Sequence, residues 1–160
     1  NVHDVHGFTD NLQRRDMESN GKDMGIDGRK IDYHTGPISW GGVGSNGQHA
    51  YHQLLHQGTH FSPSDFIMPM RSHNPIDNFH AMLVSNALSQ SQALLTGKTE
   101  QQAIDECLAD GMREGEAIAN AAQKIIPGNR ASNPLYLPKS TPHSVGALTP
   151  HYENKKATQG

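Results

Sequence analysis

Two short segments of the chain concentrate residues that could do chemistry. Residues 17–22 (MESNGK) place a carboxylate among small and polar neighbours, and residues 40–50 run from a glycine-rich turn into Asn-Gly-Gln-His. A partly desolvated carboxylate can act as a general base, and a neutral imidazole can donate or accept a proton near neutral pH. Glu18 and His49 are therefore the candidate catalytic residues.

Each of these features also has an ordinary structural explanation. A glycine-rich turn before a helix exposes backbone amides that suit an anionic or polyhydroxyl ligand, but it is also a common tight connection. No Gly-Lys-Ser/Thr follows at the spacing of a nucleotide P-loop. His49, expected in the first helical turn where the helix dipole favours a neutral imidazole, can instead be a packing histidine. Glu18 can be a solvated surface glutamate.

The 11 histidines raise the question of a metal site. His52, His56 and His60 are spaced by four residues, and two histidines on one helical face can bind zinc. No cysteine or acidic residue joins them locally, and His60 lies beyond the helix end expected at Gly58. We therefore expect no metal site.

Composition excludes several classes of protein. Thirteen basic and 16 acidic side chains give a net charge of −3, which argues against a nucleic-acid or membrane-surface protein. No apolar run approaches the roughly 18 residues of a membrane span, and residues 1–4 do not resemble a signal peptide. The single cysteine, Cys107, excludes an internal disulfide, fits a cytoplasmic location and is expected to pack in a core. Only 34% of the residues are hydrophobic, so part of the apolar surface is expected to pack against something outside the chain.

The apolar pattern predicts alternating helices and strands. We expect helices over residues 8–17, 45–58, 74–97, 99–108, 114–126 and from 141 onward, and strands over residues 31–40, 66–68 and 135–137. A turn is expected near residues 27–28, and Ile104, Cys107 and Leu108 are expected to face inward from their helix. Ser45 with Gln48 and Thr99 with Gln102 have the spacing of capping boxes, and Pro150 is expected to kink or end the last helix. The alternation indicates an α/β fold with a parallel sheet covered on both faces. Ligands bind such sheets where strands end and helices begin, which is the place of the glycine-rich turn.

Together the two dense segments resemble the glucose-6-phosphate isomerase family. The family pattern includes Met-Glu-Ser-Asn-Gly-Lys, Thr-Gly-Pro before a Trp-Gly turn, Asn-Gly-Gln-His and a Gln-Leu-x-His-Gln-Gly-Thr helix end. These motifs match residues 17–22, 35–37, 40–41, 46–49 and 53–59. Further landmarks follow in the family's order at residues 64–66, 73–75, 128–130, 141–142, 146–148 and 152–153.

The resemblance implies a sugar-isomerase α/β sandwich with a parallel-rich sheet between helices, present as a partial domain over residues 1–160. It also implies interconversion of glucose 6-phosphate and fructose 6-phosphate through a cis-enediol, without a metal or organic cofactor. Glu18 would be the base that moves a proton between C1 and C2, and His49 would open the sugar ring. Family members are homodimers in which this histidine reaches the active site of the other subunit. The alternative is a non-catalytic sugar-phosphate-binding module that acts as a sensor or partner domain.

The chain departs from the family pattern at a few positions. Arg14 stands four residues before the base, where the family commonly has a substrate-contacting glutamine, and Gln13 lies beside it. Both are candidate substrate contacts, together with Glu18 and His49. Gly41-Gly42-Val43-Gly44 replaces a common Gly-Glu-Pro-Gly, a change that leaves the candidate catalytic positions intact.

Several expected parts of the family's active site have no counterpart in the sequence. The phosphate-binding loop and an arginine would precede Asn1, and an active-site lysine would follow Gly160. Charge stabilisation and binding would come largely from those parts. We therefore expect the chain to be a piece of a longer enzyme and to be inactive alone.

Overall fold

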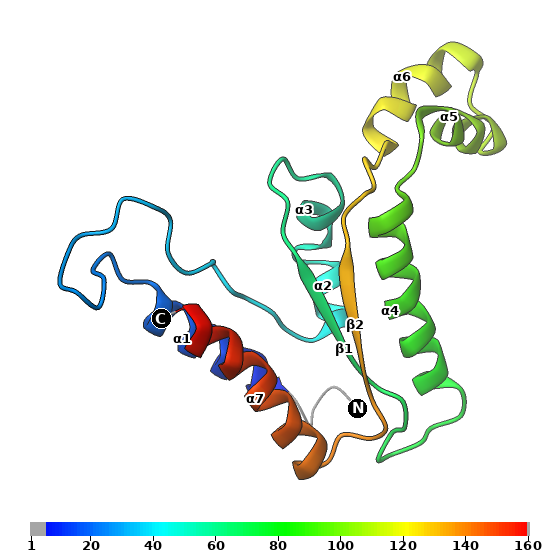
Figure 1. Ribbon diagram of the computed structural model, residues 1–160. Coiled ribbons are helices and arrows are strands. Elements are labelled where there is room, and N and C mark those ends of the chain that lie inside the picture. Colours follow the sequence, from blue (N-terminus) through cyan, green and yellow to red (C-terminus); the bar gives the residue numbers. More distant parts are fainter. Residues whose placement is uncertain (1–5, 160) are drawn as a thin grey trace. The chain divides into compact units, whose positions relative to one another are not determined.

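The computed structural model describes residues 6–159, in two compact units (Figure 1). The first unit takes in the described residues up to 47, residues 69–75 and those from 137 onward, and the second takes in residues 48–68 and 76–136. The elements follow in the order α1 (His6–Asn20), α2 (Gly44–Gln48), α3 (His52–Gln57), β1 (Ser64–Pro69), α4 (Phe79–Thr96), α5 (Glu100–Ala109), α6 (Glu114–Lys124), β2 (Ser132–Leu137) and α7 (Pro142–Gln159). This mixture of helices and strands confirms the predicted α/β class.

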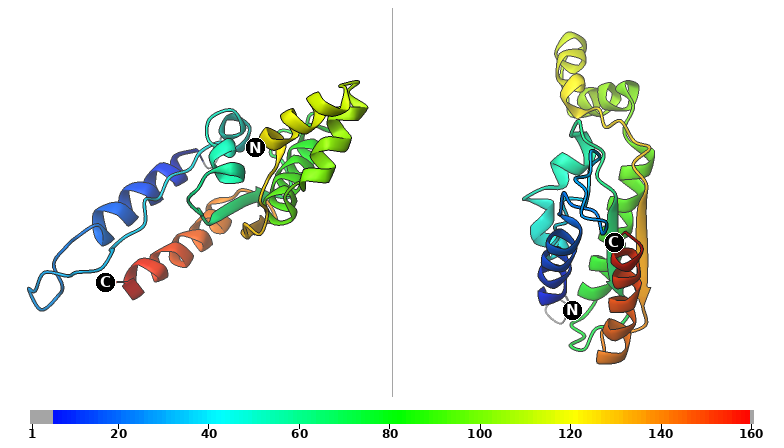
Figure 2. Two further views of the ribbon diagram at one scale, coloured as in Figure 1. Left: turned by 90° about the horizontal axis from the view of Figure 1, so that it is seen from above. Right: turned by 60° about the vertical axis from the view of Figure 1, so that its left-hand side comes forward.

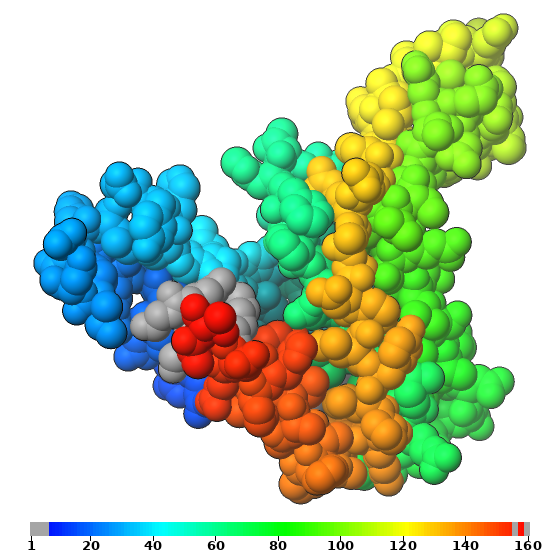
Figure 3. Space-filling model, in the orientation of Figure 1, coloured from blue at the N-terminus to red at the C-terminus, as the bar shows by residue number. Residues whose placement is uncertain are grey.

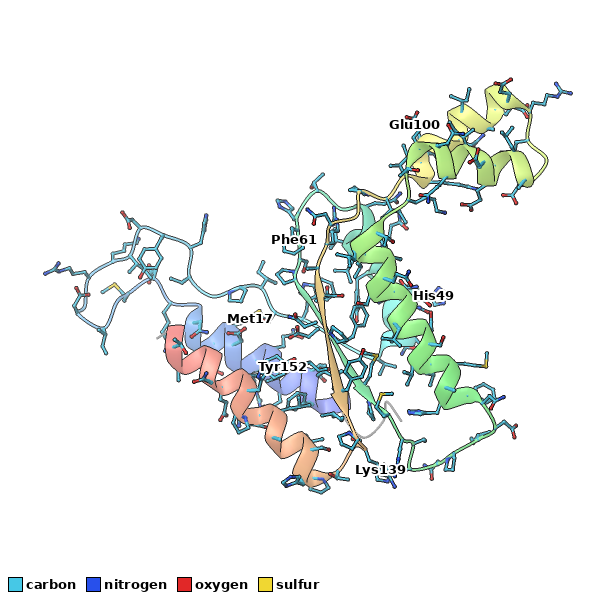
Figure 4. All side chains as sticks on the ribbon, turned by 45° about the vertical axis from the view of Figure 1, so that its right-hand side comes forward. Met17, His49, Phe61, Glu100, Lys139 and Tyr152 are labelled. Carbon is cyan, nitrogen blue, oxygen red and sulfur yellow. The ribbon has the colours of Figure 1, made fainter. Side chains whose placement is uncertain are left out.

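In the first unit, α1 and α7 pack against each other (Figure 3). The rings of Phe8 and Tyr152 meet edge to face with their centroids 6.0 Å apart, and Arg15 forms an ion pair with Glu153. Figure 4 shows Met17 and Tyr152 on these two neighbouring helices. The packing against α7 therefore supports the part of α1 that carries the candidate base.

The strands β1 and β2 pair as a two-stranded parallel sheet (Figure 1). Parallel strands need a long crossover connection, which α4, α5 and α6 supply between the two strands. In the second unit Leu55, Met68 and Leu94 are buried, one each from α3, β1 and α4. The strands predicted at 66–68 and 135–137 are confirmed within β1 and β2.

The helices α5 and α6 lie against each other as a pair (Figure 2). Ala103, Cys107, Ala117 and Ala121 are all 0% exposed. The predicted capping box of α5 is present, with Gln102 N–H bonded to the Thr99 side chain and the Gln102 side chain bonded to Thr99 N–H. Core packing of Cys107 is thus confirmed.

The strand predicted over residues 31–40 is wrong. The nearest pairing is an isolated bridge between Met24 and Lys30, and residues 31–40 form no strand. Gly36 has φ +39°, which breaks an extended run, and the proline that follows has no amide to donate to a ladder. Tyr33 and Ile38 are exposed, so their alternation with polar residues buries no face. The predicted turn near residues 27–28 is present, with Gly28 N–H bonded to Gly25 C=O.

Three further predictions about the helices need correction. The helix α4 begins at Phe79 instead of near Asn74, because Asp77 has φ +38°, a conformation that an α-helix cannot contain. Leu108 was expected to face inward and is 41% exposed, since it points away from the face that holds its buried neighbour Cys107. Of the two outcomes expected for Pro150, the helix end is wrong, because α7 continues to Gln159. The carbonyl that faces the proline ring belongs to Gly146, whose backbone adapts readily.

Many large apolar side chains remain exposed in the described residues. They include Ile26, Tyr33 and Ile38 in the segment after α1, and Phe79, Met82, Leu83, Leu88 and Leu95 on α4. None of the described helices has the length and apolarity needed to cross a membrane. Within the described residues, the apolar surface of the chain is therefore only partly buried.

The α5–α6 pair carries an ion network that makes a pH-dependent contribution to stability. Hydrogen bonding from Lys98, and then the charges of Lys98 and Lys124, hold the pKa of Glu106 below its ordinary value. A lowered pKa in the folded state stabilises the fold above the unfolded-state pKa and loses that effect as the pH falls through the folded-state value. We expect Glu106→Gln to lower the melting temperature of the protein slightly at pH 7.

Melting curves of the wild-type and Glu106→Gln proteins between pH 7 and pH 3 test this expectation. The difference between the two should shrink as the pH falls. It should also shrink in about 1 M salt, because the groups are exposed to solvent and salt screens them. A difference that is constant across the pH range would show that the charge of Glu106 has no part in it.

Candidate active site

Three of the four candidate residues lie on α1 in the first unit. Gln13 is half-buried, whereas Arg14 and Glu18 are exposed. Arg14 lines a shallow hollow along the helix with Gly7, Asp10 and Asn11. Glu18 stands in the last turn of α1, which ends at Asn20.

The carboxylate of Asp16, one turn before the end of α1, ties the following loop to the helix. Asp16 accepts hydrogen bonds from Asn20 Nδ2 at 2.8 Å and from Ser39 Oγ at 2.6 Å. Both oxygens of Asp16 are thereby used, and the loop that contains Ser39 is tied to the helix that carries Glu18. Asp16 was missed in the sequence, although its position two residues before Glu18 could have drawn attention to it.

The same loop approaches the end of α1 through Gly36. A Cβ atom at Gly36 would lie 2.8 Å from the carbonyl carbon and oxygen of Asn20 and 3.0 Å from the nitrogen of Gly21. Its φ of +39° also lies in the left-handed region that glycine adopts without strain. The Thr-Gly-Pro motif at residues 35–37 therefore has a structural reason: only glycine lets this loop lie against the residues that follow Glu18.

His49 lies in a turn between two short helices, which corrects the predicted single helix over residues 45–58. It follows Gln48, the last residue of α2, and is exposed to solvent. The argument that a helix N-terminus favours its neutral form therefore fails. Glycine has poor helix propensity, and α2 contains Gly44 and Gly47 within its five residues. The helix end predicted at Gly58 is confirmed.

The capping box predicted for Ser45 and Gln48 does not form. Ser45 lies inside α2, whose first residue is Gly44. The Gln48 side chain instead donates from Nε2 to Asn86 Oδ1 on α4, at 3.0 Å. His49 appears labelled beside this helix in Figure 4. Two residues after His49, burial raises the pKa of the Tyr51 phenol.

The histidines of α3 bind α4. His52 Nδ1 and His56 Nε2 lie 3.2 Å and 2.9 Å from the same atom, Gln90 Oε1. Their four-residue spacing thus serves a helix–helix contact. In the part of the chain that the structure describes, no group of three or more histidine, cysteine or acidic side chains could hold a metal ion. Asn86 and Gln90 were missed as polar contacts, although two amides inside an apolar helical stripe were the available signal.

The far end of α3 is held by an arginine. Arg130 donates from Nη1 to the carbonyl of Leu55 at 2.8 Å and from Nη2 to the carbonyl of Gly58. Gln57 Nε2 donates to the carbonyls of Gln123 and Ile125 at 2.9 Å and 2.7 Å. These bonds satisfy carbonyls that a helix end leaves open, and they place the Gly128-Asn129-Arg130 landmark in a structural role.

The close approach at Gly36 makes a prediction with a matched control. Alanine at Gly36 or at Gly28 would be strained by about 1–2 kcal/mol, because φ is positive at both positions. Only at Gly36 does the added Cβ meet backbone, since nothing lies within 4 Å of a Cβ at Gly28. We expect Gly36→Ala to lower the melting temperature more than Gly28→Ala does. Equal shifts in differential scanning calorimetry would contradict the close packing of this loop on α1.

The family model described as phosphoglucose isomerase matches residues 3–160. Glucose-6-phosphate isomerase of Stutzerimonas stutzeri is 52% identical over 158 residues, and that of Hahella chejuensis is 54% identical over 149 residues. These matches cover 99% and 93% of this chain but only 28% and 27% of the two relatives, so the chain spans little more than a quarter of their length.

The structural comparison agrees with the sequence comparison. A crystal structure of a glucose-6-phosphate isomerase from Chlamydia trachomatis matches with a TM-score of 0.77 and 33% identity, over 98% of this chain and 28% of the other. The likeness therefore extends through α1, the turn at His49 and the two strands. The family match over residues 3–160 and the shared fold show that the chain belongs to the phosphoglucose isomerase family.

Proposed function

We propose that the full-length protein interconverts glucose 6-phosphate and fructose 6-phosphate, and that residues 1–160 are part of its sugar-isomerase domain. The observation that carries this proposal is the 52% identity over 158 residues to a protein named glucose-6-phosphate isomerase. The chain retains a carboxylate at Glu18 and an imidazole at His49, as this reaction requires. The proposed location is the cytoplasm.

In the proposed reaction Glu18 is the base. In the open-chain aldose its carboxylate removes the proton from C2, the carbonyl oxygen at C1 gains a proton, and a cis-enediol forms. The hydroxyl proton at C2 then leaves, and the proton held by Glu18 is returned to C1, which gives the ketose. The reaction is an internal redox exchange between C1 and C2, so it needs no external oxidant or reductant.

His49 acts before this proton transfer. The substrate is a closed ring in solution, and opening it requires a proton to leave the anomeric hydroxyl and a proton to reach the ring oxygen. One imidazole can do both in turn. His49 is exposed on its turn, so it is available to a substrate bound by other parts of the protein.

The remaining candidates on α1 are proposed to bind the sugar. Arg14 is exposed, with a guanidinium able to donate several hydrogen bonds to hydroxyl or phosphate oxygens. Gln13 lies beside it and can donate or accept. Arg14 lies one turn before Glu18 on the same face of α1, so these two would meet the substrate from one side.

The exposed apolar side chains support a larger assembly. The relatives are more than three times the length of this chain, and a base works best where water is partly excluded. We propose that the rest of the polypeptide and a second subunit cover these surfaces, and that His49 serves the active site of that second subunit. The isolated chain would then be inactive.

Replacing Glu18 tests the assignment of the base. In the full-length protein we expect Glu18→Gln to lower kcat by roughly 10²- to 10⁴-fold, the range that a positioned general base contributes. A coupled assay that reduces a nicotinamide cofactor as glucose 6-phosphate forms measures this rate. Glu114→Gln, at an exposed acid on α6, is the matched control and should keep wild-type activity.

The coupled assay and a calorimetric binding measurement together separate the enzyme from a binding module. A wild-type protein that binds the sugar phosphate in calorimetry but shows no turnover in the coupled assay would be a sensor or partner domain. A Glu18→Gln rate within a few-fold of wild type would leave the isomerase activity standing but would remove Glu18 from the role of base.

A further inference from the structure

The turn that carries His49 is flanked on both sides by hydrogen bonds to one helix. Immediately before it, Gln48 bonds Asn86, and immediately after it, His52 bonds Gln90. Asn86 and Gln90 are four residues apart on α4, so they lie on one face of that helix, one turn apart. The two amides therefore hold both ends of the three-residue turn over residues 49–51.

Two histidines bond the same acceptor atom of Gln90. A carbonyl oxygen has two lone pairs, so Gln90 Oε1 can accept one hydrogen bond from His52 Nδ1 and one from His56 Nε2. Both imidazoles act as donors, at Nδ1 in His52 and at Nε2 in His56. His52 is only 8% exposed, so the loss of this acceptor would leave a nearly buried donor without a partner.

The short helix after the turn depends on such contacts. The helix α3 has six residues, and a helix of that length is not stable in water by itself. Leu55 is its one buried apolar side chain among the described residues. Its orientation is consequently set by Gln90 on one side and by Arg130 at its C-terminal end.

We propose that Asn86 and Gln90 are positioning residues for His49. Neither side chain is proposed to touch the substrate or to transfer a proton. Their role is to fix residues 48 and 52, and so to fix the backbone direction from which the His49 imidazole leaves the turn. This inference rests on the proposed ring-opening role of His49.

The experiment uses the full-length protein and steady-state kinetics with glucose 6-phosphate and with fructose 6-phosphate. Gln90→Met keeps the length of the side chain and removes the acceptor, and Gln90→Glu keeps an acceptor oxygen. Gln92→Met, at an exposed position on the same helix, is the matched control. His49→Gln is made alone and in combination with Gln90→Met.

We expect Gln90→Met to lower kcat by roughly 10- to 100-fold, because displacing a catalytic group by about 1 Å can cost 10²-fold. KM should stay within about threefold, since no substrate contact is removed. Gln90→Glu should recover kcat to within about fivefold of wild type, and Gln92→Met should match wild type. An unchanged kcat in Gln90→Met would overturn the proposal.

The combined variant separates positioning from general destabilisation. If Gln90 acts through His49, Gln90→Met should lower kcat no further once His49 is already glutamine. A further fall of tenfold or more in that background would overturn the positioning role while leaving His49 as the ring-opening group. A wild-type rate in His49→Gln alone would overturn the role of His49 itself, and the inference with it.

Asn86 provides a second variant that should fold normally, since its bond to Gln48 is at the surface. Asn86→Ala should lower kcat by up to about tenfold and have no effect in the His49→Gln background. Wild-type kcat in Asn86→Ala together with wild-type kcat in Gln90→Met would show that the turn holds His49 without either amide.

Discussion

The position of the candidate catalytic histidine depends on polar bonds between short helices and α4. Neither α2, with five residues, nor α3, with six, is long enough to be stable alone. Gln90 Oε1 bonds two imidazoles of α3, and Arg130 bonds two carbonyls at its end. This part of the fold is therefore specified by a few directional bonds more than by buried apolar area, and its geometry is correspondingly exact and easily disturbed.

A different arrangement supports the candidate base. Glu18 lies on a helix of 15 residues that packs along α7 through aromatic rings and an ion pair. Asp16 and Gly36 then bring the following loop against the end of that helix. A long helix held along its side is a stiffer support than a turn held at its two ends. The two candidate residues are thus positioned by different means. Glu18 is held by the packing of α1 along α7, and the turn that carries His49 is held by hydrogen bonds to the side-chain amides of Asn86 and Gln90.

Most of the features that the sequence predicts correctly are decided by nearby residues, although the capping box expected for Ser45 and Gln48 is equally local and does not form. The capping box at Thr99, the helix end at Gly58 and the turn at Gly28 each depend on residues within a few positions, and all three are present. Some errors have local causes, such as the φ of +39° at Gly36 and the two glycines of α2, and others arise where distant residues decide. A strand over residues 31–40 would need a partner strand to pair with, and Gln48 and His52 bond α4 from the two sides of the turn that interrupts the predicted helix. Alternation and spacing carry no information about such partners.

In the candidate site, too, the residues found from the sequence are those with informative neighbours. Glu18 and His49 were identifiable because their immediate neighbours match an ordered family pattern, whereas Asp16, Asn86 and Gln90 act on residues far along the chain or on another element. Asn86 and Gln90 share a helical stripe with apolar residues of α4, and the structure shows them bonding both sides of the His49 turn. Much of the remaining stripe, including Phe79 and Met82, is exposed in this chain. Asn86 and Gln90 are thus bonded within this chain, whereas Phe79 and Met82 on the same helix carry apolar surface that the described residues leave uncovered and that the proposed larger assembly would bury.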